Sequence, residues 1–274
     1  MTFGYAAFDL DGTLLGEDGT VDPVTLDGLR RLREHGLSLL VATGRSPYRL
    51  QQLGLRTEVL DLFEPLMLLR DGDIQWNWRT DAIESMRTVP DTVVPALLAW
   101  GFPDIVVDTG RGIVATSESA AARYARLYRC PRSSIAVSGR LPHSPALKVT
   151  VFGDRRDVVD ALTGIDGCSI GPRKAGRCNV VPHGSCKTAG LARLMAERYA
   201  EPTLGRVVAF GDGDNDVCLL GSVGAGVAMA DSHPGAARAA SLRLRGTLAG
   251  YLNAGFPRGL EKIRRAGRRC RHAT

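Results

Sequence analysis

The chain has 274 residues, of which 44% are hydrophobic and 23% charged, and a formal net charge of +6. This length allows one large domain or two modest ones. No apolar run approaches the ~20 residues that a membrane helix needs, so we predict a globular protein without a membrane partner.

The positive charge is concentrated at the C-terminus. From Arg258 onward, seven basic residues stand against one acid, Glu261, and this excess equals the whole net charge. We interpret the tail, residues 258–274, as a solvated end. RNP, zinc-finger and helix-turn-helix signatures are missing, so we predict no nucleic-acid partner.

The six cysteines are scattered and form no Cys-x-x-Cys pair. This spacing argues against a zinc site and against a disulfide framework. No basic segment followed by an apolar h-region precedes the first predicted strand. We therefore expect a reduced, cytoplasmic protein that acts as a monomer or a weak homodimer.

Strands and helices alternate in the first 70 residues. An apolar strand spans about 3–10, and a helix then begins at the N-cap Asp22 with Pro23 in its first turn. Further strands are predicted at 37–42 and 65–69, with a helix between them that opens at Ser46. This alternation predicts an α/β fold with a doubly wound parallel sheet.

The pattern changes to a mixed α+β stretch from about residue 76 to residue 181. The predicted elements are a hairpin of 105–107 and 113–115, a helix over 118–128, a strand at 148–152, a helix over 155–162, and paired strands at 168–170 and 179–181. We therefore predict a core formed by 1–78 and 184–257, and an inserted domain of 79–183.

Chemically active side chains follow three of the predicted core strands. Asp9 and Asp11 follow the first, Thr43 the second, and Asp212 and Asp216 a strand over 207–210. Ligands of open α/β sheets bind beyond the carboxyl ends of the strands. Two acids two residues apart suit an aspartyl nucleophile and a general acid, although the same string also fits a calcium loop or an ordinary turn.

Together with Lys187, these clusters resemble the four motifs of the haloacid dehalogenase superfamily of phosphoryl-transfer enzymes. The forms Asp-Gly-Thr-Leu-Leu after Leu10, Ala42-Thr43-Gly44-Arg45 and Gly-Asp-Gly-Asp-Asn-Asp from Gly211 are similar to those of its Cof-type branch. The resemblance implies a Rossmann-like core with a large inserted cap. It also implies a magnesium-dependent phosphomonoester hydrolase that forms an aspartyl-phosphate.

By this resemblance Asp9 is the nucleophile, and Asp11 first protonates the leaving oxygen and then deprotonates water. Thr43 and Lys187 bind the phosphoryl oxygens, and Asp212 and Asp216 hold Mg²⁺ together with Asp9 and the Asp11 backbone carbonyl. Further substrate contacts are expected from Gly12, Thr13, Gly44, Arg45 and Asn215. Arg45 fits either the site entrance or a salt bridge, and Asn215 fits either a phosphate contact or the orientation of Asp9.

Two positions depart from the branch's pattern. Asp71-Gly72 stands where an Asn-Gly pair is usual, and Ala230-Asp231-Ser232 replaces Gly-Asn-Ala. These extra carboxylates suggest a substrate with a cationic or hydroxyl-rich part. We predict a small phosphorylated substrate, a sugar phosphate, with a phosphomutase of the phosphomannomutase type or a non-enzymatic regulatory protein as alternatives.

Overall fold

The computed structural model describes residues 3–139, 145–171 and 175–254, and within them the chain forms two compact units. The core unit comprises the chain up to Arg45, Leu53–Glu84 and the described chain from Cys186 onward. The insert unit comprises Ser46–Gln52 and Ser85–Ser185. The basic tail predicted at 258–274 lies outside the described residues.

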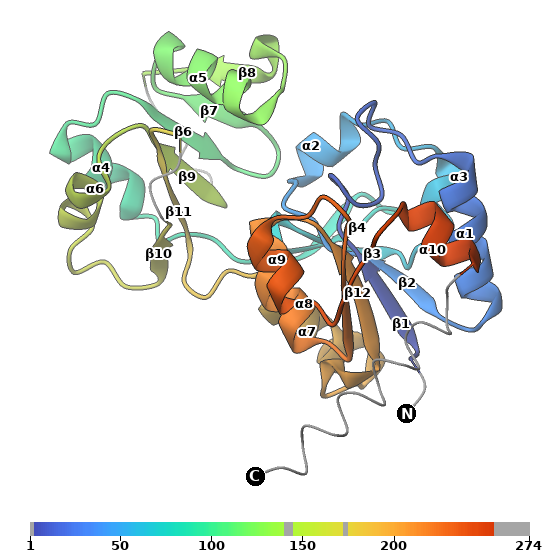
Figure 1. The fold of residues 1–274 in the computed structure, drawn as a ribbon. Coiled ribbons are helices and arrows are strands. Elements are labelled where there is room, and N and C mark those ends of the chain that lie inside the picture. Colours follow the sequence, from blue (N-terminus) through green and yellow to red (C-terminus); the bar gives the residue numbers. More distant parts are fainter. Residues whose placement is uncertain (1–2, 140–144, 172–174, 255–274) are drawn as a thin grey trace. The chain divides into compact units, whose positions relative to one another are not determined.

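A five-stranded sheet of parallel pairs forms the centre of the core unit (Figure 1). Its middle strand is β1 (Tyr5–Phe8), buried on both faces as the continuous apolar run predicts. The sheet order is β14 (Leu242–Arg243), β13 (Ala225–Ala228), β12 (Val207–Gly211), β1 and β2 (Ser38–Val41). The predicted doubly wound parallel sheet is confirmed.

The third predicted strand, β3 (Leu66–Leu69), lies beside β2 but pairs fully with a strand that we did not predict. Thr43 N donates to Leu68 O at 2.9 Å, which continues the parallel sheet. On its other side β3 is antiparallel to β4 (Ile74–Asn77), followed in the same small sheet by β5 (Ala82–Met86). Polar residues interrupt this hairpin, so its period of two is weak in the sequence.

Helices cover both faces of the core sheet. On one face, Leu26, Leu29 and Leu32 of the first helix are buried, as their spacing predicts, and its N-cap Asp22 accepts from Val24 N at 2.9 Å. The helices of this unit are α1 (Pro23–Glu34), α3 (Thr57–Leu60), α7 (Lys187–Tyr199), α8 (Val217–Ser222), α9 (Pro234–Ala239) and α10 (Leu248–Ala254), with 3-10 turns at Arg70–Gly72, Leu204–Arg206 and Asp214–Asp216.

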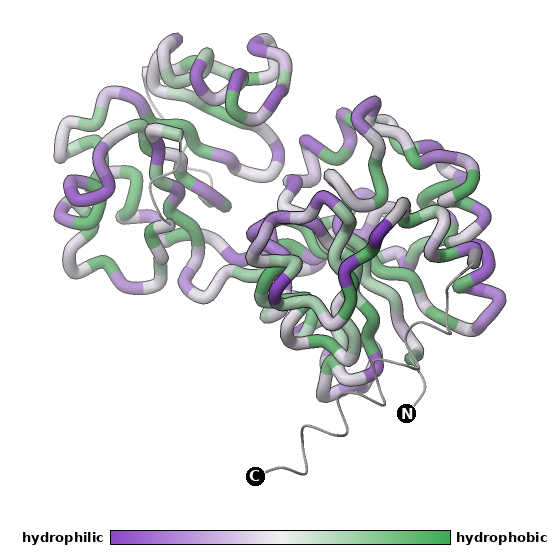
Figure 2. Tube along the Cα trace, in the orientation of Figure 1, coloured by the Kyte–Doolittle hydropathy of each residue, from purple (hydrophilic) through white to green (hydrophobic). Residues whose placement is uncertain are grey.

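The insert unit is built on a six-stranded mixed sheet (Figure 1). Its order is β10 (Cys168–Ile170), β11 (Cys178–Pro182), β9 (Lys148–Val151), β6 (Ile105–Asp108), β7 (Ile113–Ala115) and β8 (Ile135–Val137). Its helices are α2 (Pro47–Gln51), α4 (Val93–Trp100), α5 (Glu118–Tyr128) and α6 (Arg155–Ala161), with a 3-10 turn at Arg132–Ser134. In Figure 2 hydrophobic stretches mark the strands of both units.

Two glycines allow the helix that carries Lys187 to approach the turn after β3. A Cβ on Gly190 would lie 2.4 Å from Gly72 Cα, and Gly72 itself has a φ of +90°. A methyl group at residue 190 would therefore collide with backbone. This close approach fixes α7 against the polar end of the sheet.

We predict that Gly190→Ala lowers the free energy of unfolding by about 1–3 kcal/mol, since the backbone of Gly72 must move. Gly221→Ala in α8 is the matched control, because its Cβ would meet nothing closer than 3.8 Å. Urea unfolding of both variants measures the effect. Equal stability of the two variants would contradict this packing.

Candidate active site

Lys187 brings the acids of two strand ends together. Its Nζ donates to Asp9 Oδ1 at 2.6 Å and to Asp216 Oδ1 at 2.7 Å. Asp9 follows β1, Asp216 lies in the turn after β12, and Lys187 is the first residue of α7. Lys187 and Asp216 are completely buried, and Asp9 is 5% exposed. The three predicted residues thus form one buried ionic cluster.

The loop after β12 fixes the second oxygen of Asp216. Oδ2 accepts from Asp212 N at 3.1 Å and from Gly213 N at 2.9 Å. A Cβ on Gly211 would lie 2.5 Å from Asp216 Cγ, so only glycine fits there. Both Asp216 oxygens are therefore constrained before any ligand binds.

Three of the predicted metal ligands converge. Asp9, Asp212 and Asp216 each offer a carboxylate oxygen, and these oxygens lie within 4.8 Å of one another. Thr13 Oγ1 donates to Asp212 Oδ1 at 3.2 Å. Oxygen donors of this kind suit a hard divalent cation such as Mg²⁺, which needs few protein carboxylates because it retains water.

Gly12 permits this convergence. Its φ is +75°, and a Cβ there would lie 2.4 Å from Asp212 Oδ2. Any larger residue would push the Asp212 carboxylate away from Asp9. The predicted residue Gly12 thus has a structural function beside any contact with substrate.

The cluster contains three acids, Asp9, Asp212 and Asp216, around the single ammonium of Lys187. Burial raises the pKa of Asp9 to about 7, helped by the Asp216 charge and opposed by Lys187. Burial and Asp216 also raise the pKa of Asp212. Burial lowers the pKa of Lys187, but Asp9 and Asp216 outweigh it and hold that pKa above its usual range. The cluster is therefore electrostatically suited to an added cation.

Asp11, in contrast, is held by an arginine outside the buried cluster. Arg45 donates to both of its carboxylate oxygens, from Nε at 2.8 Å and from Nη2 at 2.6 Å. The Asp11 side chain is 57% exposed and that of Arg45 18%. Of the two predictions for Arg45, the structure shows the salt bridge. The Asp11 carboxylate is not among the three converging oxygen donors.

The neighbouring turns join Asn215 to Asp71, a contact that we did not predict. Asn215 Nδ2 donates to Asp71 Oδ1 at 2.8 Å, and Asp71 adopts the left-handed region with φ 55°. A Cβ on Gly44 would lie 3.2 Å from Asp71 Oδ1. Thr43 is buried, and its Oγ1 accepts from Arg45 N at 3.2 Å. The Asp-Gly pair in place of Asn-Gly was the signal that could have indicated this partner.

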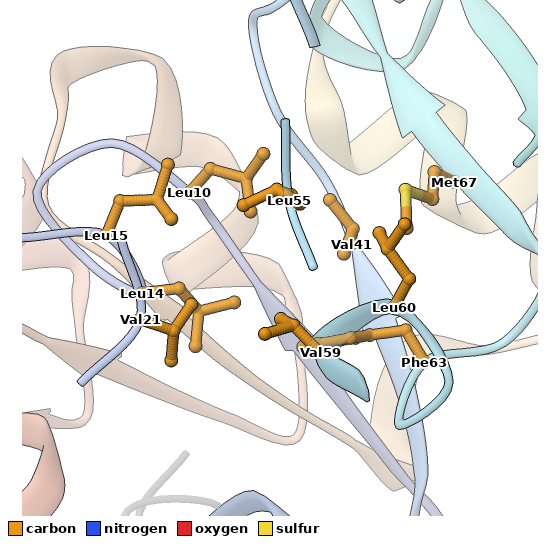
Figure 3. Close-up of a pocket in the computed structure, with 10 residues that line it drawn as sticks. All are labelled: Leu10, Leu14, Leu15, Val21, Val41, Leu55, Val59, Leu60, Phe63 and Met67. Carbon is orange, nitrogen blue, oxygen red and sulfur yellow. The ribbon is translucent and has the colours of Figure 1, made fainter. Parts of the chain in front are cut away.

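An apolar cluster anchors the loop that carries the first two acids. Leu10, between Asp9 and Asp11, points into this cluster with Leu14, Leu15 and residues of β2, α3 and β3 (Figure 3). The space between them is about 10 Å³, no more than one water molecule requires. This part of the loop is therefore tightly packed, which fixes the positions of Asp9 and Asp11 on either side of Leu10.

Comparison with known proteins shows the family of the chain. A family model described as haloacid dehalogenase-like hydrolase matches residues 6–245. The chain belongs to this family. As the motifs predicted, it falls in the Cof-type branch of the haloacid dehalogenase-like hydrolases, and it is an enzyme, a phosphatase.

Individual relatives agree with this assignment. An HMP-PP phosphatase from Enterobacter sp. (strain 638) is 30% identical over 237 residues, covering 84% of this chain and 85% of that protein. A phosphatase of the haloalkanoate (HAD) superfamily from Bacteroides thetaiotaomicron has a TM-score of 0.75 at 19% identity, covering 96% of this chain and 95% of that chain. A HAD subclass IIB sugar phosphatase has a TM-score of 0.69 at 19% identity, covering 91% and 98%.

We predict that Lys187→Met lowers the free energy of unfolding by about 3–5 kcal/mol in EDTA, because two buried carboxylates lose their counter-ion. Adding Asp9→Asn should restore part of that loss by removing one of them. Urea unfolding of the single and double variants measures both effects. Wild-type stability of Lys187→Met would show that the ammonium does not hold the cluster.

Proposed function

We propose that this chain is a magnesium-dependent phosphomonoester hydrolase that acts on a small phosphorylated metabolite through an aspartyl-phosphate. The observation that carries this proposal is the buried cluster of Asp9, Lys187 and Asp216, with Asp212 beside it. Phosphoryl transfer requires a nucleophile, a proton for the leaving oxygen and positive charge near the equatorial oxygens. The strand-end loops of the core unit contain a candidate for each.

Asp9 is the proposed nucleophile. Its Oδ1 is engaged by Lys187, so attack by the other oxygen, Oδ2, would leave the ion pair in place. The Oδ2–phosphorus bond forms as the bond from phosphorus to the leaving oxygen breaks. Hydrolysis of the resulting acyl phosphate by water then restores the carboxylate and releases inorganic phosphate.

Asp11 is the proposed acid and base. It would protonate the leaving alkoxide in the first step and take a proton from water in the second. Arg45 donates to both oxygens of Asp11, so this pair would have to loosen for the carboxylate to exchange a proton with the leaving group. Arg45 would then be available to a phosphoryl oxygen, which reconciles its salt bridge with a function at the site.

Thr43 and Lys187 are proposed to bind the phosphoryl oxygens. Both residues are buried: Lys187 contacts the proposed nucleophile Asp9, and Thr43 follows β2, the strand beside β1. Gly12, Thr13, Gly44 and Asn215 are proposed as further substrate contacts, and Asp71 orients the Asn215 side chain. Mg²⁺ held by Asp9, Asp212 and Asp216 would neutralise phosphoryl charge.

The relatives suggest the substrate class. One acts on sugar phosphates by its description, and the curated relative is an HMP-PP phosphatase. We therefore place sugar phosphates first and HMP-PP second for this chain. None of the described helices is long and apolar enough to cross a membrane.

The function is tested by a phosphate-release screen over sugar phosphates, HMP-PP and nucleotides. We predict that Asp9→Asn lowers kcat by several orders of magnitude for every substrate found, because the covalent nucleophile is lost. Its circular dichroism and unfolding midpoint should remain close to wild type. Near-normal phosphate release from well-folded Asp9→Asn would refute the aspartyl-phosphate.

Metal dependence is a separate prediction. Treatment with EDTA should abolish turnover, and Mg²⁺ should restore it. Asp212→Ala should raise the Mg²⁺ concentration needed for half-maximal activity at least about tenfold, since one oxygen ligand is lost. Asp27→Asn, an exposed acid of α1, is the matched control. Full activity in EDTA would contradict the metal assignment.

A further inference from the structure

The two faces of the insert sheet differ in polarity across three adjacent strands, β11, β9 and β6. Ile105, Val107, Val149, Val151, Cys178 and Val180 form an apolar core with α4 and α6. Because side chains alternate along a strand, the intervening residues point to the opposite face. Those residues include Asp108 of β6, Lys148 and Thr150 of β9, and Asn179 of β11.

α5 covers only part of that opposite face. Val106 packs there with Ala120, Ala121 and Tyr124 of the helix. The helix ends at Tyr128, and the polar residues begin where this cover stops. Asp108 lies opposite Lys148 in the register, and Thr150 Oγ1 donates to Asn179 Oδ1 at 3.0 Å.

Three cations converge on Tyr128. Lys148 Nζ donates to its hydroxyl at 3.0 Å, and Arg177 Nε donates to the same oxygen at 3.2 Å. Arg49 Nη2 donates to the Tyr128 carbonyl at 2.8 Å, and its guanidinium lies 5.4 Å from the ring centroid. Lys148 is 5% exposed, whereas Tyr128 and both arginines are only half-buried. Three of the four residues of the cluster are therefore partly exposed.

Burial and the neighbouring cations act on the phenol of Tyr128 in opposite directions. Burial raises the pKa of Tyr128, but Lys148 and Arg177 outweigh it and lower that pKa to about 7. Asp108 lies on the same sheet face, and its Oδ1 accepts from Gly110 N at 2.9 Å. The phenol oxygen accepts from two cations and donates only a long hydrogen bond, at 3.5 Å, to Asn179 Oδ1. The two cationic donors suit an oxyanion, because charge-assisted hydrogen bonds are the stronger ones.

We propose that Lys148, Arg177 and Arg49, gathered on the sheet face beside Tyr128, form a binding site for an oxyanion, a phosphate or carboxylate group of a small molecule. The arginine fork can bind two oxygens of such a group, and the Lys148 ammonium can bind a third. The oxyanion replaces the phenol oxygen as acceptor, and Tyr128 then keeps its proton. Binding at this site does not depend on the hydrolysis proposed above.

The test uses the full-length protein in EDTA, with inorganic phosphate as the probe. At about pH 8, one unit above its lowered pKa, Tyr128 is mostly phenolate and contributes tyrosinate absorbance in the ultraviolet. Added phosphate should lower the tyrosinate absorbance along a saturating binding curve. The reason is that the anion binds the cations that otherwise stabilise the phenolate. Tyr128→Phe should remove the signal, which assigns it to this residue.

Calorimetry of the same titration measures affinity directly. Arg177→Gln, at a half-buried position, should weaken the phosphate binding reported by Tyr128 at least about tenfold, whereas Arg126→Gln, on the exposed side of α5, should not. Lys148→Met is the second variant and gives the same expectation if it folds. Phosphate that leaves the Tyr128 absorbance unchanged, or equal affinity in Arg177→Gln, would overturn the site.

Two sources of the oxyanion are separated by kinetics. If it is a second anionic group of the substrate, Arg177→Gln raises KM more for a substrate with that group than for p-nitrophenyl phosphate. If it is a free ligand, the ratio of these KM values is unchanged, while the phosphate-induced loss of tyrosinate still disappears in the variant. Both kinetic results support the oxyanion site. A negative absorbance test would reject this site without affecting the Asp9→Asn test of the proposed function.

Discussion

The buried ammonium of Lys187 is the interaction on which the rest of the core unit depends. It is fully removed from water and contacts two carboxylates from different strand ends. A buried charge without its partner costs several kcal/mol, so β1, the turn after β12 and the start of α7 must meet with little freedom. The tight approach of Gly190 to Gly72 and the absence of a side chain at Gly211 are what allow that meeting.

The acids around this ammonium differ in how strongly they are held. Asp216 accepts from two backbone amides and from Lys187, so its carboxylate has little freedom to rotate. Asp11 is exposed and is bound only through its side chain, by an arginine. A metal ligand benefits from the first arrangement, because its geometry is set before binding. A group that transfers protons benefits from the second, because it must change partners during each turnover.

Much of this site could be predicted from the sequence, because strand ends are local features. Apolar runs followed at once by Asp9, Thr43 and Asp212 place those residues at one edge of a parallel sheet. The bond between Asn215 and Asp71 was not predicted, because it joins turns 144 residues apart and the Asp-Gly pair at Asp71 indicates an unusual residue there without naming its partner. The β4–β5 hairpin and helix α4 were also missed, because tertiary packing rather than periodicity determines them.

The two tyrosines of α5 show where helical spacing stops being informative. Tyr124 and Tyr128 are one turn apart on the same helix. Tyr124 is 1% exposed within the apolar cluster, whereas the Tyr128 hydroxyl receives Lys148 and Arg177. The helix is the same, so the difference comes from the sheet beneath it. Strand alternation places Lys148 on the face that α5 covers, where its buried ammonium meets the hydroxyl of Tyr128, the last residue of the helix. The polar surroundings of Tyr128 therefore depend on where α5 ends relative to β9. The sequence pattern of neither segment predicts that position.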